Sequence, residues 1–335
     1  MISSFHSVPG TRASLAAKQH TRHGSGQMAA RKKQPVGVIG LGSMGIGVAR
    51  TLLKKGFEVH ACDVRPEVSK AFAAEGGVAA ATPAAVGRRT EVVIILVVNA
   101  DQTSDVLFGR DGAAGTLASG SVVVASSTVA PEFATDLGER LRAKDILMID
   151  APVSGGAVRA AKGELSIMAS GTNDAFKKAD AVLGAISAKV YRLGDTPGMG
   201  SKVKMINQLL AGVHIAASAE AMALGIRTGA DPQVLYDVIS NSAGSSWMFQ
   251  NRVPHIIAGD YTPLSAVNIF VKDLGIVLDS AKKMTFPLPL TAAAHQMFLG
   301  AAGAGLGYED DSAVVKVYQA LSGIKLPGKK KAKKP

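Results

Sequence analysis

The fold of this chain is decided by Gly37-Val38-Ile39-Gly40-Leu41-Gly42-Ser43-Met44-Gly45, whose last three glycines have the spacing G-x-G-x-x-G. A predicted strand precedes the motif and a predicted helix follows it. Gly40 permits a tight turn out of the strand, and Gly42 lets a pyrophosphate approach the backbone. Gly45 lets the helix pack close to the sheet. The stretch therefore predicts a dinucleotide site at the N-terminus of a helix.

The second predicted strand, Phe57–Cys62, ends directly before Asp63, which lies 18 residues beyond Gly45. A carboxylate at this point accepts hydrogen bonds from the adenosine ribose. It also repels a 2′-phosphate, so the sequence favours NAD over NADP. Arg65 partly offsets this repulsion if it reaches the phosphate, although a solvated loop charge is the simpler interpretation.

Length and composition indicate a two-domain globular protein. The 335 residues allow about two domains, and 47% hydrophobic residues are ample for buried cores. The single cysteine, Cys62, excludes an intramolecular disulfide and is interpreted as an inert buried thiol. Charges interrupt every apolar run of the ~20 residues that a membrane span needs. We therefore expect an untargeted, cytoplasmic protein.

The net charge of +11 belongs to the two ends of the chain. Residues 1–34 and 323–335 together carry twelve Lys and Arg and no acid, so the remainder carries a net charge of −1. The composition of both ends predicts disorder. They either aid solubility or attach weakly to polyanions, and Met28 is an alternative start. Neither a nucleic acid nor a membrane is the expected partner.

Short apolar runs alternate with helical patterns from residue 35 to residue 195, which predicts a doubly wound parallel sheet of the Rossmann type. The predicted strands are Val36–Gly40, Phe57–Cys62, Glu91–Val97, Ser121–Ala125, Asp145–Ile149, Leu165–Ser170 and Lys189–Leu193. Residues 196–322 read as an all-helical C-terminal domain, joined to the sheet by a long helix that starts near Ser201. Its predicted helices are 201–229, 232–240, 265–284, 288–301 and 312–321.

Ligands of open parallel sheets bind beyond the carboxyl ends of the strands. Three segments are expected there: Val98–Ala100, Ser126–Thr128 and Asp150–Gly156. Hydroxyls and the backbone N–H groups beside glycines suit a carboxylate, which needs several donors from one side. Serine and glycine are also ordinary turn residues. Each of the last two segments, taken alone, therefore fits an ordinary turn as well as a carboxylate site.

The helical domain offers further candidates. Lys204, Asn207 and Gln208 lie on one face of a predicted helix. A lysine exchanges a proton with a substrate oxygen if its pKa is lowered, whereas a surface lysine is the plainer interpretation. Lys272 and Asp273 interrupt an apolar helix, either facing the site or forming a surface ion pair. His214, His255 and His295 lack the spacing of metal ligands, so no metal is expected.

Four segments, in this order, resemble the β-hydroxyacid dehydrogenase family, which includes 3-hydroxyisobutyrate dehydrogenases and tartronate semialdehyde reductases. They are Gly40–Gly45 (cofactor), Asp150–Gly156 (substrate), Gly198–Gln208 (catalysis) and Lys272–Leu274 (cofactor contact). The match runs from about residue 35 to residue 323. The chain departs from the family at one position of the catalytic segment, because it has Asn207-Gln208 where the family commonly has Asn-Asn.

The resemblance implies oxidation of a small hydroxy acid by NAD, with Lys204 as the general base, in a homodimer or homotetramer. The implied cofactor contacts are Gly40, Leu41, Gly42, Ser43, Met44, Gly45, Asp63, Val64, Val98, Asn99, Thr128 and Lys272. The implied substrate contacts are Ser127, Ser154, Gly155, Gly156, Asn207, Gln208 and Asp273. The alternatives are another hydroxy acid of the same family, a dinucleotide-binding module without activity, and a nucleic-acid binder that uses the tails.

A narrower resemblance to one branch of the family implies that the substrate is a four-carbon sugar acid, oxidised at its 2-hydroxyl. It is carried by residues 150–158, 208–216, 246–249, 259–263, 286–290 and 309–314.

Overall fold

A computed structural model describes residues 34–328 of the chain. The predictions of disorder for 1–33 and 329–335 fall on residues outside this range. Residues 323–328 of the predicted C-terminal tail are described, and Ile324 is buried in the apolar core of the helical part. The predicted domain boundaries at 195 and 322 stay predictions.

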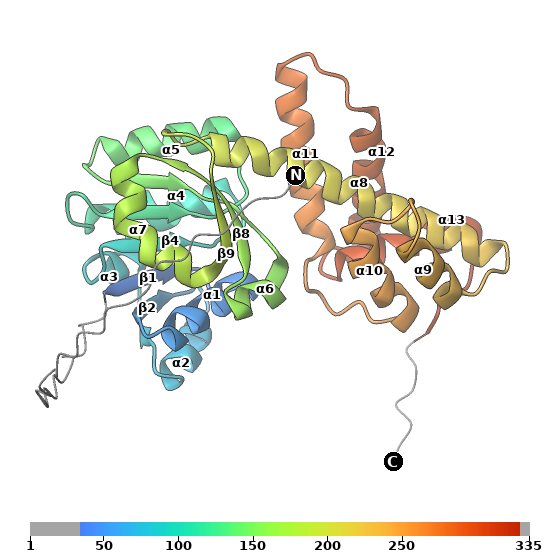
Figure 1. Ribbon diagram of the computed structural model, residues 1–335, viewed down its shortest axis with the longest axis horizontal. Coiled ribbons are helices and arrows are strands. Elements are labelled where there is room, and N and C mark those ends of the chain that lie inside the picture. The colour runs from blue at the N-terminus through green and yellow to red at the C-terminus, as the bar shows by residue number, and fades with distance from the viewer. Residues whose placement is uncertain (1–33, 329–335) are drawn as a thin grey trace, which may run out of the picture. The chain divides into compact units, whose positions relative to one another are not determined.

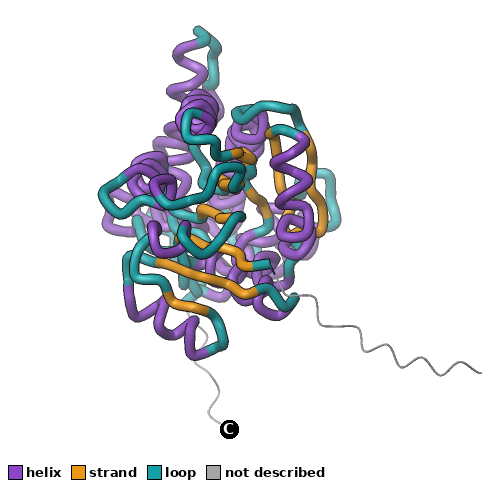
Figure 2. The backbone as a smooth tube through the Cα atoms, turned by 90° about the vertical axis from the view of Figure 1, so that its left-hand side faces the viewer, coloured by secondary structure: helices purple, strands orange, loops and turns teal. Residues whose placement is uncertain are grey.

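The sheet has nine strands in the order β3-β2-β1-β4-β5-β6-β8-β7, with β9 paired to β8. Their bounds are β1 Pro35–Ile39, β2 Glu58–Cys62, β3 Val78–Ala79, β4 Val92–Ile95, β5 Val122–Ala125, β6 Leu147–Asp150, β7 Val153–Ser154, β8 Leu165–Gly171 and β9 Ser187–Arg192. The seven predicted strands are all present, whereas the two-residue strands β3 and β7 were not predicted. Figure 2 shows the strands as neighbouring segments enclosed by helices.

The sheet is parallel from β3 to β6, as predicted, but its extension is mixed. Strand β8 runs antiparallel to both β6 and β7, and only β9 is parallel to β8. The connection from β6 to β8 runs through residues 151–164, which include β7 and α6, so its length would also allow a parallel neighbour. The fold remains a parallel-dominated sheet of the Rossmann type.

Successive side chains of the central strands enter two different cores, as the period of two along a strand requires. Val92 and Ile94 of β4 pack in the cluster that contains residues of α1 and α7. Val93 and Ile95 pack in the cluster that contains residues of α3, α4 and α5. Burial on both faces explains the uninterrupted apolar runs in the sequence. The helices of this part are α1 Ser43–Lys54, α2 Pro66–Ala74, α3 Pro83–Gly87, α4 Ala100–Phe108, α5 Pro131–Arg142, α6 Gly156–Lys162 and α7 Asn173–Ile186.

The C-terminal part is helical and has its own apolar core, formed by residues between Ile215 and Ile324. Its α-helices are α8 Met199–Arg227, α9 Pro232–Ser240, α10 Trp247–Ala258, α11 Val267–Lys283, α12 Pro289–Ala301 and α13 Val315–Ser322. Helix α10 was not predicted; it contains Pro254, a residue that normally breaks helices. Helices α11 and α12 pack against each other and against α8 (Figure 1).

Helix α8 is the one helix of the described chain that is long and apolar enough to cross a membrane by length and composition. The core helix of a globular domain passes the same test, and α8 packs against α10, α11, α12 and α13. Val203, Ile206 and Leu210, at helical spacing, are exposed. The expected homo-oligomer stays a prediction.

Replacement of Gly45 by alanine is expected to destabilise the protein. The added Cβ would lie 1.9 Å from the carbonyl oxygen of Gly40, so the turn between β1 and α1 must shift. The expected loss is roughly 1–3 kcal/mol of the free energy of unfolding, measured by urea denaturation. Gly184→Ala in the exposed part of α7, where nothing lies within 4 Å of the new Cβ, is the control and gains up to about 1 kcal/mol. Equal stability of G45A and the wild type would contradict the argument.

Candidate active site

The glycine turn between β1 and α1 has the shape that a dinucleotide needs. Gly40 has a φ of +93°, and a Cβ there would lie 2.7 Å from the carbonyl oxygen of Leu96. Gly42 differs, because nothing lies within 4 Å of its virtual Cβ. The turn is therefore tight against the sheet on one side and open on the side from which a pyrophosphate would approach. Ser43 and Met44 form the first turn of α1, whose N-terminal N–H groups favour an anion.

Asp63 is held at the end of β2 and joined to the glycine turn. Its Oδ2 accepts a hydrogen bond from the backbone N–H of Leu41 (2.7 Å), and its own N–H donates to Ser69 Oγ (3.0 Å). Arg65 donates to Oδ1 from Nε at 2.9 Å and from its backbone N–H at 3.0 Å. Burial alone would raise the pKa of Asp63, but the hydrogen bonds from Arg65 and Leu41 outweigh it and lower the pKa. Asp63 is thus a preformed anion.

Two exposed apolar side chains follow strands at the same edge of the sheet. Val64 follows β2 and is 91% exposed, and Val98 follows β4 and is half exposed. An apolar ligand surface such as an adenine ring would cover side chains of this kind. The side-chain oxygen of Asn99 instead accepts a hydrogen bond from the Gln102 N–H and so caps α4 (2.8 Å). Asn99 can therefore contact a cofactor only through its side-chain amide nitrogen or its backbone.

The segment after β5 carries one buried hydroxyl and one contact with the helical part. Ser127 Oγ is buried and lies 3.1 Å from Thr103 Oγ1 on α4. The carbonyl oxygen of the next residue, Thr128, accepts a hydrogen bond from Lys272 Nζ on α11 (3.0 Å). The structure therefore brings together Thr128 and Lys272, which the sequence places 144 positions apart.

Ser154, Gly155 and Gly156 form the turn between β7 and α6. Gly155 has a φ of +132° and Gly156 a φ of +69°, backbone angles that residues other than glycine rarely adopt. The turn can offer the Ser154 hydroxyl and backbone N–H groups to a carboxylate. No hydrogen bond within residues 34–328 joins these three residues to Lys204, so their shared role at one substrate stays a prediction.

The N-terminus of α8 is fixed by a carboxylate from the sheet. Asp150, the last residue of β6, is buried and accepts hydrogen bonds from the N–H of Gly198 (2.9 Å) and of Ser201 (2.8 Å). Its other oxygen accepts from Ser201 Oγ (2.7 Å). Gly200 N–H donates in addition to Ser170 Oγ on β8 (3.0 Å). Four hydrogen bonds thus anchor the helix that carries Lys204 to the carboxyl end of the sheet.

Lys204 lies in the second turn of α8 and is only 6% exposed. Burial, which penalises the ammonium form, lowers the pKa of Lys204 to about 8. The negative charge of Asp273 opposes this shift, and the positive charge of Lys272 adds to it. Within the described residues Nζ of Lys204 has no hydrogen-bond partner. A buried amine with a lowered pKa is suited to take a proton near neutral pH.

Beside Lys204, a chain of polar contacts runs from α8 to α11. Asn207 donates from Nδ2 to Gln208 Oε1 (3.0 Å), and Gln208 donates from Nε2 to Asp273 Oδ2 (2.5 Å). Lys272 donates to the other carboxylate oxygen of Asp273 (2.5 Å). Asp273 and Gln208 are both buried. Lys272 and Asp273 do form an ion pair, but it is not a surface pair, because Asp273 is buried and both residues belong to this network.

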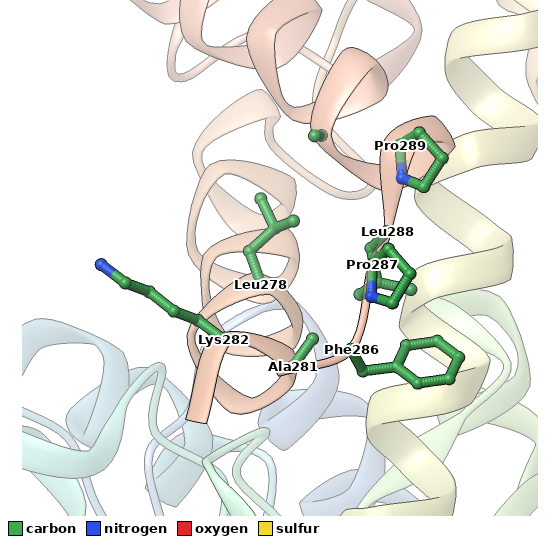
Figure 3. A pocket seen from close by; sticks show the side chains of 8 residues that line it. Leu278, Ala281, Lys282, Phe286, Pro287, Leu288 and Pro289 are labelled. Carbon is green, nitrogen blue, oxygen red and sulfur yellow. The ribbon is translucent and has the colours of Figure 1, made fainter. Parts of the chain in front are cut away.

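Among the described residues, no group of three or more His, Cys, Asp or Glu side chains is placed to hold a metal ion. An apolar pocket of about 530 Å³ lies where α11 meets α12 (Figure 3). Leu278 and Lys282 line it on α11, Phe286, Pro287 and Leu288 line it on the connecting segment, and Pro289 lines it at the start of α12. None of the predicted site residues lines this pocket.

The fold and the site define a nicotinamide-dinucleotide oxidoreductase. Residues 35–194 match the family model of the NAD binding domain of 6-phosphogluconate dehydrogenase. Residues 198–318 match that of the NAD-binding domain of NADP-dependent 3-hydroxyisobutyrate dehydrogenase. The two matches together cover most of the chain, so it is an NAD(P)-binding enzyme.

The chain belongs to the 3-hydroxyisobutyrate dehydrogenase family. It is 64% identical over 294 residues to L-threonate dehydrogenase of Cupriavidus necator, covering 88% of this chain and 98% of the relative. It is 50% identical over 296 residues to L-threonate dehydrogenase of Escherichia coli, covering 88% of this chain and 97% of that one. A crystal structure of 3-hydroxyisobutyrate dehydrogenase from Salmonella typhimurium superimposes with a TM-score of 0.81 at 51% identity, covering 85% of this chain and all of that one.

Sequence reasoning missed the residues that support the site. Asp150 was predicted only as the start of a substrate segment, and Ser201 only as the approximate start of the long helix. Thr103, which contacts Ser127, lies in a helix with no distinguishing signal. The one available signal was the pair of glycines at 198 and 200, which marks a helix start that needs an acceptor from elsewhere in the fold.

Replacement of Asp150 by alanine is expected to cost roughly 2 kcal/mol of the free energy of unfolding, because buried N–H groups of Gly198 and Ser201 lose a charged acceptor. Asp150→Asn keeps one acceptor oxygen and is expected to lose less. The matched control is Asp231→Ala, which removes the exposed N-cap of α9 and costs about 1 kcal/mol. Urea denaturation measures all three. An effect of D150A no larger than that of D231A would show that the buried cap does not anchor α8.

Proposed function

We propose that this chain catalyses the NAD-dependent oxidation of L-threonate at C2 to 2-dehydro-L-erythronate, with Lys204 as the general base. The observation that carries the proposal is the buried position of Lys204, with its pKa lowered to about 8, on a helix anchored to the sheet. The substrate is supported by the L-threonate dehydrogenases that share 64% and 50% of their aligned residues with this chain.

In the proposed reaction each site residue has one role. Ser127 and the turn Ser154–Gly156 hold the substrate carboxylate. Lys204 accepts the proton of the 2-hydroxyl, whose oxygen becomes the carbonyl oxygen as the C2–H bond breaks. The nicotinamide of a bound dinucleotide supplies the acceptor for the hydride that leaves C2. Asn207 orients the substrate or Lys204, because its amide is itself held by Gln208.

The proposed cofactor lies along the glycine turn Gly40–Gly45, with its adenosine ribose on Asp63 and its nicotinamide half near Thr128 and Lys272. The open space at Gly42 and the anchored carboxylate of Asp63 support this arrangement. Asp63 favours the free 2′-hydroxyl of NAD, because its carboxylate is ionised and held close to the turn.

The test of this function is NADH formation with L-threonate beside D-threonate, D-erythronate, glycerate and 3-hydroxyisobutyrate. We expect the highest kcat/KM with L-threonate. Lys204→Ala is expected to lose about 10²–10⁴-fold in kcat, the usual contribution of a general base, while NADH fluorescence titration shows unchanged cofactor binding. The matched control is Lys202→Ala, which removes an exposed lysine two residues away on α8.

Two outcomes contradict the proposal in different ways. A higher kcat/KM with another hydroxy acid would overturn the substrate and leave the mechanism. Full turnover by K204A would overturn the base.

The pH profile of kcat/KM is expected to rise with pH through an apparent pKa near 8, because Lys204 must be neutral to accept a proton. Lys272→Met removes a positive charge that disfavours the ammonium of Lys204, so its pKa and the rising limb move to higher pH. Asp273→Asn removes a negative charge that favours the ammonium, so the limb moves to lower pH. Rates measured from pH 6 to pH 10 give the sign of each shift. Shifts in the same direction, or none, would show that the titrating group is not Lys204.

A further inference from the structure

A second cavity lies at the edge of the sheet where the parallel strands begin, whereas the predicted active site lies where they end. Its volume is about 340 Å³, which is within the range of small-molecule sites. It is lined at the points where α3, α4 and α5 lead into β4, β5 and β6, three strands that are neighbours in the sheet. None of the predicted site residues lines it, so this cavity is separate from the dinucleotide site.

Each of the three connections contributes one cation to the cavity. Arg88 follows α3, Arg110 follows α4 and Lys144 follows α5, and all three residues are exposed. Within residues 34–328 none of these side chains has an ion-pair or hydrogen-bond partner. Asp111 is the one carboxylate that lines the cavity, and its side chain has no such partner in that range either. The lining therefore has more positive than negative charge, and a cleft with an excess of one sign concentrates ions of the opposite sign.

Hydrogen bonds between the segments that form the walls fix the shape of the cavity. The N–H of Ala84 donates to the carbonyl oxygen of Asp111 (2.8 Å), and Thr116 Oγ1 donates to the carbonyl oxygen of Ala84 (2.8 Å). The N–H of Gly112 donates to the carbonyl oxygen of Gly109 (3.0 Å), which closes the turn between α4 and β5. Because the walls are ordered in advance, binding there does not have to order the backbone.

We propose that this cavity binds a small phosphate monoester. Such a ligand carries nearly two negative charges at neutral pH, which matches the three cations and one carboxylate of the lining. Arginine binds phosphate through two parallel hydrogen bonds. Leu107 and Phe108 offer an apolar surface to the carbon atoms of the ester. The proposed hydroxy-acid substrate has a single charge, so it does not fit this lining equally well. The inference does not depend on the proposed function.

The experiment is a calorimetric titration of the purified protein with glycerol 3-phosphate. The protein is first saturated with NADH, so that phosphate cannot enter the glycine turn. We expect the wild type to bind glycerol 3-phosphate at millimolar concentration or below, more weakly as NaCl is added, and not to bind glycerol.

Substitutions of the lining test whether the ligand occupies this cavity. Arg110→Ala and Lys144→Ala are each expected to raise the Kd about three- to tenfold, because one charge-assisted contact is lost. Asp111→Asn removes the opposing charge and is expected to lower the Kd about two- to fivefold. Arg88→Ala replaces either alanine variant if urea denaturation shows that the variant is not folded.

The matched control is Arg89→Ala, which removes an exposed arginine next to Arg88 that does not line the cavity. Its Kd is expected to equal that of the wild type. Absence of binding by the wild type, or equal binding by the wild type, R110A and K144A, would overturn the proposal. Weakening by R89A as large as that by R110A would also overturn it, because the ligand would then respond only to diffuse surface charge. Failure of L-threonate turnover counts against the proposed function and leaves this titration unaffected.

Discussion

The site depends on the buried carboxylate of Asp150, which fixes where α8 begins. An α-helix leaves its first N–H groups without partners, and α8 has no side-chain cap of its own. Asp150 supplies that acceptor from the end of β6, so the direction of the helix is set by the sheet that would bind the dinucleotide. The position of Lys204 relative to the glycine turn follows from this contact, because Lys204 lies only one turn further along α8.

Burial of Lys204 has an energetic cost that its surroundings only partly offset. A pKa of about 8 in place of 10.5 corresponds to roughly 3 kcal/mol against the ammonium form. Asp273 is close enough to stabilise that ammonium, but it is also engaged by Lys272 and Gln208. The site therefore keeps a carboxylate beside the lysine without forming a direct ion pair with it. Such a lysine exchanges protons near neutral pH, which an exposed lysine does not.

The sequence predicted the parts of this architecture that local rules determine. The glycine spacing and the double-sided burial of strands such as β4 are local, and so is the pattern of α9, which was predicted over 232–240 and is found there. The direction of β8 was not predictable, since apolar content identifies a strand but not its orientation. The anchors of α8 and the contact between Thr103 and Ser127 join residues far apart in sequence. Helix α10 escaped prediction because Pro254 argues against a helix, and its packing against α8 overrides that preference.

Gln208, where the chain departs from the Asn-Asn pair of the resembling family, lies within the polar network. A glutamine has one more methylene than the asparagine that commonly occupies this position. Its amide reaches from α8 to Asp273 on α11 while its oxygen still accepts from Asn207. Asp273 holds Lys272, and Lys272 donates to the carbonyl oxygen of Thr128 beyond β5. Gln208 therefore belongs to a continuous series of hydrogen bonds from the helix of Lys204 to the loop of Ser127. In this chain Asn207 donates to Gln208, and Gln208 holds the carboxylate that positions Lys272.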